Sequence, residues 1–300
     1  MTGPRTSVMR AYAKINLTLD VGARRPDGYH AISSVMQTIA LHDTLTVTRT
    51  ADAPGVRLEV TGDESEGVPA DESNLVHRAA VRLQKVACAR GSVPGNESGL
   101  HVRLHKCIPS RAGLGGGSSD AAATLRAANE LLDLALSHMR LAEIGAALGA
   151  DVPFFLTGGT AWVEGLGERV TALPPLHPPW HLVIVKPPVG VSTAAAYAAL
   201  DALPGRAPGA ATDAWLRGEK NPANDFEAVL LPAYPQIAAA HATLRQTGLT
   251  DESFRPLLCG SGSCVFRRVS TVGEGERLAG EVKAAGRGKV WVTATQGANE

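Results

Sequence analysis

The feature that most constrains the fold of this chain is a run of glycines that leads directly into a helix-forming segment. Gly115 to Gly117 are followed by Ser118 and Ser119, and then by residues rich in Ala and Leu as far as Leu132. Glycine adopts backbone conformations that other residues avoid, and it lets a ligand approach the main chain closely. The Ala-rich segment favours a helix, which the serines could cap. Because a helix N-terminus offers free N–H groups and a partial positive charge, the run predicts a phosphate-binding loop.

Two familiar phosphate-binding motifs do not fit this run. A Walker A loop needs Gly-Lys-Ser/Thr after four spacer residues, and the position expected after Gly113 holds Ser118-Ser119 with no lysine. A dinucleotide-binding fingerprint needs a third glycine where Ser118 stands, and an acidic residue at the end of a second strand, which is missing. A glycine-rich turn without a ligand is the remaining alternative. Such a turn would be costly, because each glycine loses extra backbone entropy on folding.

The composition is that of an ordinary globular chain, with 300 residues, 44% hydrophobic content and a formal net charge of zero. This length suits two modest domains or one large one. The charge gives no indication of nucleic acid or an anionic membrane as a partner, and no apolar run is long enough to cross a bilayer. The four cysteines are scattered, which argues against a zinc site or a disulfide framework. Since the N-terminus also lacks a signal peptide, we expect a cytoplasmic protein. Its oligomeric state is left open.

Hydrophobic periodicity predicts strands and helices in mixed order, which favours an α+β architecture. The expected strands cover residues 8–21, 45–50, 56–60, 100–104, 156–163, 182–185 and 290–295. The expected helices cover residues 74–89, the glycine run to Leu132, 137–148, 192–203, 225–244 and 278–285. Residues 45–50 and 56–60 are expected to pair as antiparallel neighbours. The proline-rich stretch 174–179 is expected to link two domains, 1–173 and 174–300.

A lysine and an aspartate stand among apolar neighbours. In the first expected strand, Lys14 and Asn16 share one face, which could line a polar cleft. A lysine that points to solvent is the alternative. Asp151 lies between Gly149-Ala150 and the apolar residues 152–155, and a carboxylate in such surroundings needs a partner. Lys14 is a candidate partner, and a polar residue in a helix-exit turn is the alternative for Asp151.

Tyr29 and His30 follow a turn at Asp27-Gly28. The tyrosine offers an aromatic face, and the imidazole offers two hydrogen-bonding positions. Together they suit a planar base that stacks on the phenol ring and is read along its polar edge. A surface tyrosine in a turn is the alternative.

These motifs together resemble the GHMP kinase superfamily, which includes galactokinase, homoserine kinase and mevalonate kinase. Residues 109–122 are similar to its second signature motif, and residues 260–263 resemble its third. The triple glycine, residues 28–30 and residues 149–155 occur together in order, and this combination resembles the 4-diphosphocytidyl-2-C-methyl-D-erythritol kinases. The resemblance extends from Ala11 to Phe266.

The resemblance implies a two-domain GHMP kinase fold, with a ribosomal-S5-domain-2-like N-terminal domain and a ferredoxin-like C-terminal domain. It implies that ATP, with Mg²⁺, phosphorylates the 2-hydroxyl of a small cytidine-diphosphate substrate in the methylerythritol phosphate pathway of isoprenoid synthesis. No nucleic-acid or membrane partner is expected. Another GHMP kinase, of the mevalonate or homoserine type, is the nearest alternative, although those substrates carry no base to stack on Tyr29. A catalytically silent nucleotide-binding protein on this fold is the other, and the presence of both Lys14 and Asp151 argues against it.

The resemblance also implies the roles of individual residues. Lys14 and Asp151 match the catalytic pair: Asp151 would accept the proton of the attacking hydroxyl, and Lys14 would orient it and keep it ionised. The expected ATP-binding residues are Pro109, Gly113, Leu114, Gly115, Gly116, Gly117, Ser118, Ser119, Asn74 and Lys106. The expected substrate-binding residues are Asn16, Tyr29, His30, Thr193 and Tyr197. The sequence identifies no protein carboxylate as a ligand of the metal.

Overall fold

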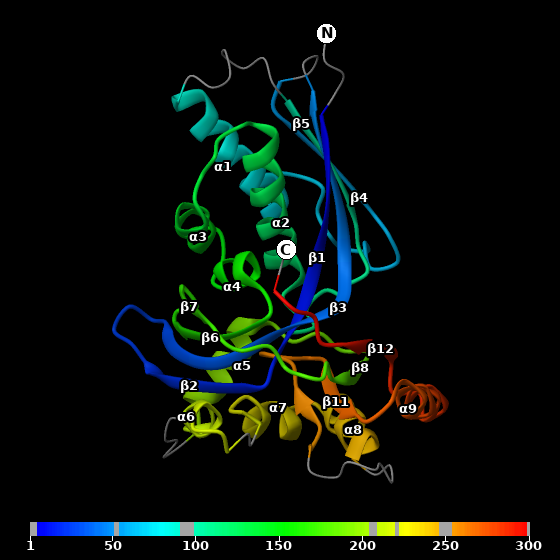
Figure 1. The fold of residues 1–300 in the computed structure, drawn as a ribbon. Helices are drawn as coiled ribbons and strands as arrows, with labels where there is room; N and C mark the ends of the chain where they lie inside the picture. The colour runs from blue at the N-terminus through cyan, green and yellow to red at the C-terminus, as the bar shows by residue number, and fades with distance from the viewer. Residues whose placement is uncertain are drawn as a thin grey trace. The chain divides into compact units, whose positions relative to one another are not determined.

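The computed structural model describes residues 5–50, 54–90, 99–203, 209–219, 222–245 and 254–298. The chain forms two compact units (Figure 1). The first comprises Met1–Ala13, Leu41–Ile108 and Gly115–Thr157, and the second comprises Lys14–Ala40, Pro109–Leu114 and Gly158–Glu300. These units alternate along the chain, so they are not the expected domains 1–173 and 174–300, which stay a prediction.

The sheet of the first unit is built around β3 (His30–Thr50), a long strand of which residues 44–50 pair antiparallel with β5 (Gly99–His105). β5 in turn pairs in parallel with β4 (Val56–Thr61), and β1 (Thr6–Asn16) pairs with β3. The expected antiparallel pairing of residues 45–50 with 56–60 is therefore wrong, because β5 lies between them. Periodicity indicates that a segment is a strand, but the neighbour of that strand is chosen by packing between distant segments.

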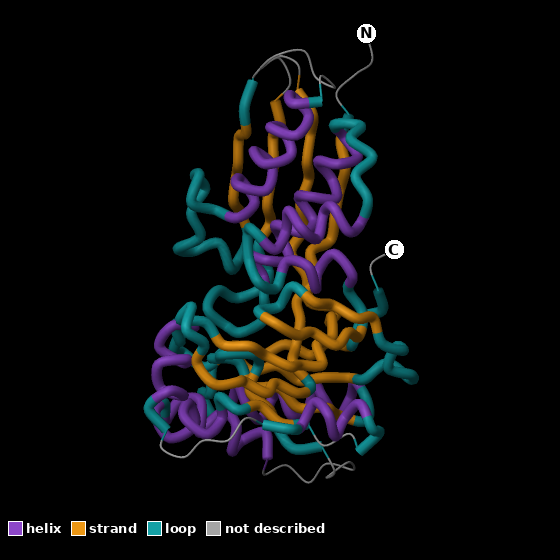
Figure 2. Tube along the Cα trace, turned by 90° about the vertical axis from the view of Figure 1, so that its left-hand side faces the viewer, coloured by secondary structure: helices purple, strands orange, loops and turns teal. Residues whose placement is uncertain are grey.

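Helices cover one face of this sheet (Figures 1 and 2). α1 (Leu75–Ala89) follows its predicted bounds, with Asn74 as its N-cap and Leu83 among the residues on its buried face. It packs against α2 (Gly116–Leu131) and against β4. α3 (His138–Ala146) and α4 (Val152–Thr157) pack against each other and against α2. The strand expected at 156–163 is wrong at its start, because a short apolar run reads equally well as a buried helix.

In the second unit, β2 (Thr18–Arg24) pairs antiparallel with the first part of β3 and in parallel with β9 (Ala223–Asn224). Residues 32–37 of β3 also pair antiparallel with β6 (Thr160–Gly165), which pairs with β7 (Arg169–Ala172). The sequence did not predict this part of β3. Residues 34–39 are buried without a break, so the alternation that reveals a half-exposed strand is missing.

A separate sheet in the second unit has β8 (His181–Lys186) between β11 (Val265–Val269) and β12 (Lys289–Ala294), with β10 (Leu257–Leu258) on β11. α8 (Pro235–Arg245) and α9 (Val272–Ala284) pack on it. The expected helix 225–244 is divided, since α7 (Glu227–Ala233) ends before Tyr234 and α8 begins at Pro235. Proline is unfavourable inside a helix but suits its first position.

α5 (Thr193–Asp201) and α6 (Ala211–Leu216) complete the helices described in the second unit, and α5 packs on α7 while α6 packs on β2. An apolar cluster joins β2, β8, α5, α7 and β10 and includes Val21, Val185, Phe226 and Leu258. No helix within the described ranges is long and apolar enough to span a membrane.

Candidate active site

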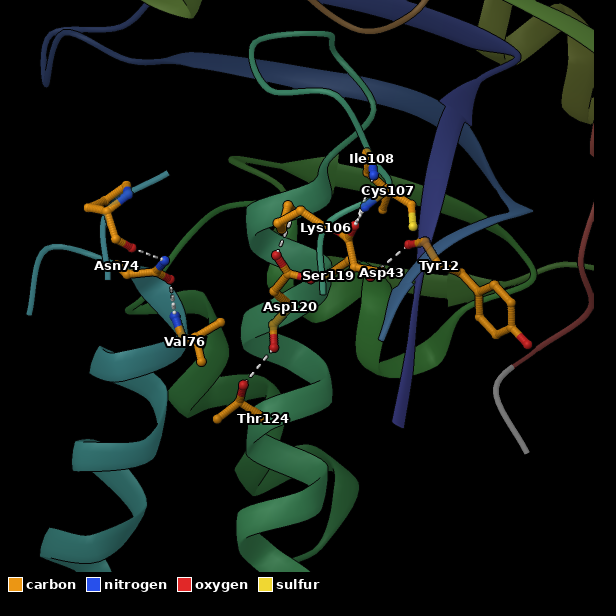
Figure 3. A network of polar contacts seen from close by, with 11 residues as sticks. Tyr12, Asp43, Asn74, Val76, Lys106, Cys107, Ile108, Ser119, Asp120 and Thr124 are labelled. Atoms are coloured by element: carbon orange, nitrogen blue, oxygen red, sulfur yellow. Dashed lines mark hydrogen bonds and ion pairs between the residues drawn. The ribbon is translucent and has the colours of Figure 1, made fainter. Parts of the chain in front are cut away.

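The glycine run forms the start of α2, as the sequence predicts. Gly115, the residue before the helix, is left-handed with a φ of 73°, and no side chain caps the helix. The serines lie inside the first turn, so the expectation that they cap it is wrong. Ser119 Oγ instead donates a hydrogen bond to the carbonyl oxygen of Tyr12, at 2.6 Å (Figure 3). Because the first N–H groups of a helix have no partner within it, this uncapped start offers donors to an anion.

Residues 109–114, just before the glycine run, belong to the second unit and lie against a second glycine loop, residues 259–263. A Cβ on Gly113, whose φ is 77°, would come within 1.8 Å of the carbonyl oxygen of Cys259. The N–H of Cys264 donates to the carbonyl oxygen of Ala112 at 3.0 Å. Only glycine fits at position 113, and residues 259–264 hold this part of the loop in place. Local sequence patterns contained no signal for that contact.

Lys14 and Asn16 are brought together as the strand pattern suggests. Lys14 Nζ donates to Asn16 Oδ1 at 2.7 Å, and Asn16 Nδ2 donates to Ser34 Oγ at 2.8 Å. The Lys14 residue is 4% exposed, so the alternative of a lysine that points to solvent is excluded. A Cβ on Gly260 would lie 3.0 Å from Lys14 Nζ. The second glycine loop therefore lies next to Lys14 and Asn16.

Asp151 lies in the turn before α4, in the first unit, and is half-buried. The N–H of Val152 donates to the carbonyl oxygen of Gly149 at 3.1 Å and closes this turn. A Cβ on Gly149 would lie 3.5 Å from Ser118 Oγ. The structure therefore places the turn that carries Asp151 beside the first turn of α2. Lys14 belongs to the second unit, and its pairing with Asp151 stays a prediction.

Lys106 and Asn74, both expected to bind ATP, have polar atoms that the protein itself engages (Figure 3). Asn74 Oδ1 accepts from the N–H of Val76 at 2.9 Å, and its Nδ2 donates to the carbonyl oxygen of Pro69 at 2.7 Å. The ammonium of Lys106 donates to the carboxylates of Asp43 and Asp120, the latter at 2.8 Å. Contact of either residue with ATP stays a prediction.

Neither Asp43 nor Asp120 is among the site residues expected from the sequence. Asp120 is visible in the sequence as an acidic residue in an Ala-rich helix, whereas Asp43 stands between His42 and Thr44, which give no sign of its burial. Burial raises the pKa of the Asp120 carboxyl to about 8, with the charge of Lys106 opposing this shift and that of Asp43 adding to it. Burial lowers the pKa of Lys106, but the two carboxylates outweigh that effect and the net shift is upward.

The residues expected to bind the cytidyl group gather in the second unit. The ring of Tyr29 lies at the surface, with the residue 64% exposed. His30 is buried and stacks on Tyr197 of α5, with ring centroids 5.0 Å apart. Its Nδ1 lies 3.0 Å from the carbonyl oxygen of Gly22, and its Nε2 lies 3.4 Å from a carboxylate oxygen of Asp201.

Thr193, at the start of α5, is connected to the second glycine loop. Its Oγ1 lies 3.2 Å from Ser261 Oγ, and either hydroxyl can donate. Four of the five residues expected to bind the cytidyl substrate thus have described contacts within one unit, with Tyr29 at its surface. Their role toward a ligand stays a prediction.

Comparison with known proteins gives consistent likenesses. Residues 74–159 match the family described as GHMP kinases N terminal domain. The chain is 46% identical over 267 residues to the 4-diphosphocytidyl-2-C-methyl-D-erythritol kinase of Moorella thermoacetica, covering 85% of this chain and 87% of that protein. It is 44% identical over 266 residues to the kinase of the same name from Pelotomaculum thermopropionicum, covering 85% and 86%.

Solved structures agree with the sequence relatives. A crystal structure of 4-(cytidine 5'-diphospho)-2C-methyl-D-erythritol kinase matches with a TM-score of 0.74 and 33% identity, over 97% of this chain and 100% of that one. A mevalonate kinase from L. major matches with a TM-score of 0.70 and 14% identity, over 99% and 98%. The second likeness shows the fold alone. The expected α+β GHMP kinase fold is confirmed.

Proposed function

The chain belongs to the 4-diphosphocytidyl-2-C-methyl-D-erythritol kinase family, and on that premise we propose how its residues carry the reaction. The chain is an ATP-dependent small-molecule kinase. It phosphorylates the 2-hydroxyl of 4-diphosphocytidyl-2-C-methyl-D-erythritol and releases ADP, a step of isoprenoid precursor synthesis by the methylerythritol phosphate pathway. We propose that the reaction takes place in the cytoplasm.

The observation that carries the assignment of residues is the proximity of Gly149 to Ser118, whose Oγ would lie 3.5 Å from a Cβ placed on Gly149. It puts the turn of Asp151 next to the uncapped start of α2. The N–H groups of that start suit the β- and γ-phosphates. A carboxylate in the adjacent turn suits the acceptor hydroxyl, which must meet the γ-phosphorus in line.

In the proposed step, the 2-oxygen of the acceptor forms a bond to the γ-phosphorus while the bond from that phosphorus to the bridging oxygen of ADP breaks. Asp151 takes the proton of the hydroxyl. Lys14 keeps Asp151 ionised and oriented. A nearby cation weakens a carboxylate as a base, but a loose transition state demands little of the base until late. A weakly basic carboxylate is therefore sufficient, although Asp151 must still accept the proton.

Magnesium is proposed to accompany ATP, where it would neutralise charge on the β- and γ-phosphates. Among the residues that the structure describes, no three His, Cys, Asp or Glu side chains gather into a metal site. This fits Mg²⁺, which in kinases is held largely by phosphate oxygens and water with few protein ligands. The half-buried Ser118, in the first turn of α2, is the residue that would add a protein oxygen.

For the acceptor, Tyr29 is proposed to stack on the cytosine, because its ring is exposed while its neighbour His30 is buried. An edge-reading role for His30 requires that a base replace the 3.4 Å contact from its Nε2 to Asp201. That contact is longer than a good hydrogen bond. Tyr197 is proposed to hold the imidazole of His30 in its orientation, because the two rings are stacked.

ADP release from Mg-ATP tests this function, with the purified protein offered the cytidyl substrate, mevalonate and homoserine in parallel. We expect turnover with the cytidyl substrate alone, and phosphorus NMR should show one new phosphomonoester and an intact diphosphate. Turnover with mevalonate or homoserine instead would contradict the acceptor. ATP binding without turnover on any of the three would indicate a silent nucleotide-binding protein.

A further inference from the structure

An ammonium group lies directly beneath the first turn of α2. A Cβ on Gly116 would come within 3.3 Å of Lys106 Nζ and within 3.1 Å of Ile108 Cγ2. The Lys106 side chain is 4% exposed. The turn that offers N–H groups to phosphate therefore lies next to a buried lysine. Because residue 116 is a glycine, the lysine ammonium can lie this close to the helix backbone.

Two buried carboxyl groups accept hydrogen bonds from that lysine (Figure 3). Asp43, on β3, accepts from the Lys106 ammonium, and its Oδ1 also accepts from the N–H groups of Cys107 and Ile108, at 2.5 and 2.8 Å. Asp120, on α2, accepts from the same ammonium through Oδ2. The cluster of Asp43, Lys106 and Asp120 thus ties the helix to the end of β5 and to β3.

The hydrogen bonds of Asp120 do not account for its burial. Its Oδ1 is buried and makes no hydrogen bond in the described structure. A carboxylate that is buried with one oxygen unpaired is costly, and a well-packed apolar residue at such a place is often at least as stable. What Asp120 supplies is a fixed, charge-assisted link between α2 and Lys106. No side-chain cap fixes this helix start in another way.

We propose that Asp43 and Asp120 are positioning residues for the ATP phosphates. They hold the Lys106 ammonium under the start of α2, so that the N–H groups of the first turn stay aimed at one place. This inference rests on the proposed function only in that ATP is the ligand of the glycine run.

Asp120→Ala tests the proposal, with Thr124→Val as the matched control. Thr124 is also buried in α2, and its Oγ1 donates to the carbonyl oxygen of Asp120 at 2.7 Å without touching Lys106. We expect Asp120→Ala to weaken Mg-ATP binding in calorimetry on the order of tenfold, with the KM for the cytidyl substrate unchanged. Thr124→Val should bind Mg-ATP like the wild type. Asp120→Asn, which can still accept from Lys106, should lie between wild type and alanine.

Affinity for Mg-ATP within twofold of wild type in Asp120→Ala would overturn the proposal, as would equal losses for both substrates. If the alanine variant does not fold, Asp120→Asn decides by the same comparison, because it keeps the size of the side chain and replaces only its carboxyl group. A wild-type protein that binds Mg-ATP but does not phosphorylate the cytidyl substrate would refute the proposed function. The comparison of ATP affinities would still decide this inference.

Discussion

Lys14 Nζ donates a hydrogen bond to Asn16 Oδ1 at 2.7 Å, and both side chains are buried on β1. Asn16 also donates to Ser34 Oγ, so the amide holds the ammonium in a fixed place. Hydrogen bonds to a charged group contribute about 1.5–3 kcal/mol. If Lys14 acts on the reacting groups, Asn16→Ala should lower kcat by roughly ten- to a hundredfold. Ser34→Ala, one step further away, should cost less, and a kcat for Asn16→Ala equal to wild type would show that the contact does not serve catalysis.

Asp151→Asn should abolish turnover while Mg-ATP still binds. The amide keeps the shape of the side chain in the turn before α4, but it cannot accept the proton of the attacking hydroxyl. Single-turnover ADP formation and calorimetric ATP affinity measure the two effects separately. Retained activity would rule out Asp151 as the base.

Two alanine variants test different roles of the glycines. Gly113→Ala tests whether the loop needs this glycine to fold, and Gly117→Ala tests whether ATP needs it to approach the backbone. At position 113 a Cβ would lie 1.8 Å from the carbonyl oxygen of Cys259, and φ is 77°. This variant should lose both thermal stability and ATP binding. At position 117 a Cβ meets only the side chain of Leu75, at 3.8 Å, so the melting temperature should be retained. A higher KM for ATP in Gly117→Ala would show that phosphate passes close to that backbone, whereas a lower melting temperature would contradict the described contacts.

Tyr29→Ala should raise the KM for the cytidyl substrate more than the KM for ATP. Because Tyr29 is 64% exposed, removing its ring should change the interaction with the ligand more than the packing of the protein. Base–aromatic stacking contributes about 1–3 kcal/mol, which corresponds to roughly a five- to 150-fold rise in KM. Tyr29→Phe keeps the ring and should remain close to wild type. Equal changes in both KM values would argue against stacking.

Acid should destabilise the protein partly through His241 of α8. Its Nε2 lies 2.9 Å from the carbonyl oxygen of Pro256, and burial lowers its pKa below the ordinary value of 6.5, with the charge of Glu227 opposing the shift. Below that value the unfolded chain binds a proton that the folded chain resists, so this contribution to stability is lost as the pH falls. His241→Gln should therefore lose less melting temperature than wild type between pH 7 and pH 5. An identical slope would contradict this account.

Local signals in the sequence were sufficient for several elements. The apolar 3.6-residue pattern of residues 74–89 predicts α1, and the alternation of Leu100, Val102 and Leu104 predicts β5. Local signals were insufficient to distinguish a strand from a helix where a segment is buried on all sides. Residues 34–39 of β3 and residues 152–157 of α4 show no alternation, so strand and helix cannot be told apart there.

The sequence by itself determined the chemistry of the parts: a glycine run at a helix start, Asp151 in an apolar turn, Lys14 beside Asn16, and Tyr29 with His30. These signals lie within a few residues of each other, because capping, turn geometry and side-chain parity are local properties of the chain. Only the tertiary structure decided that β5 lies between β3 and β4 and that Gly113 packs against the carbonyl group of Cys259. It also decided that Asp43 and Asp120 both accept hydrogen bonds from the ammonium of Lys106. Those contacts join residues 14 to 146 positions apart. They arise because packing and the pairing of buried charge select partners by position in space, which local periodicity does not encode.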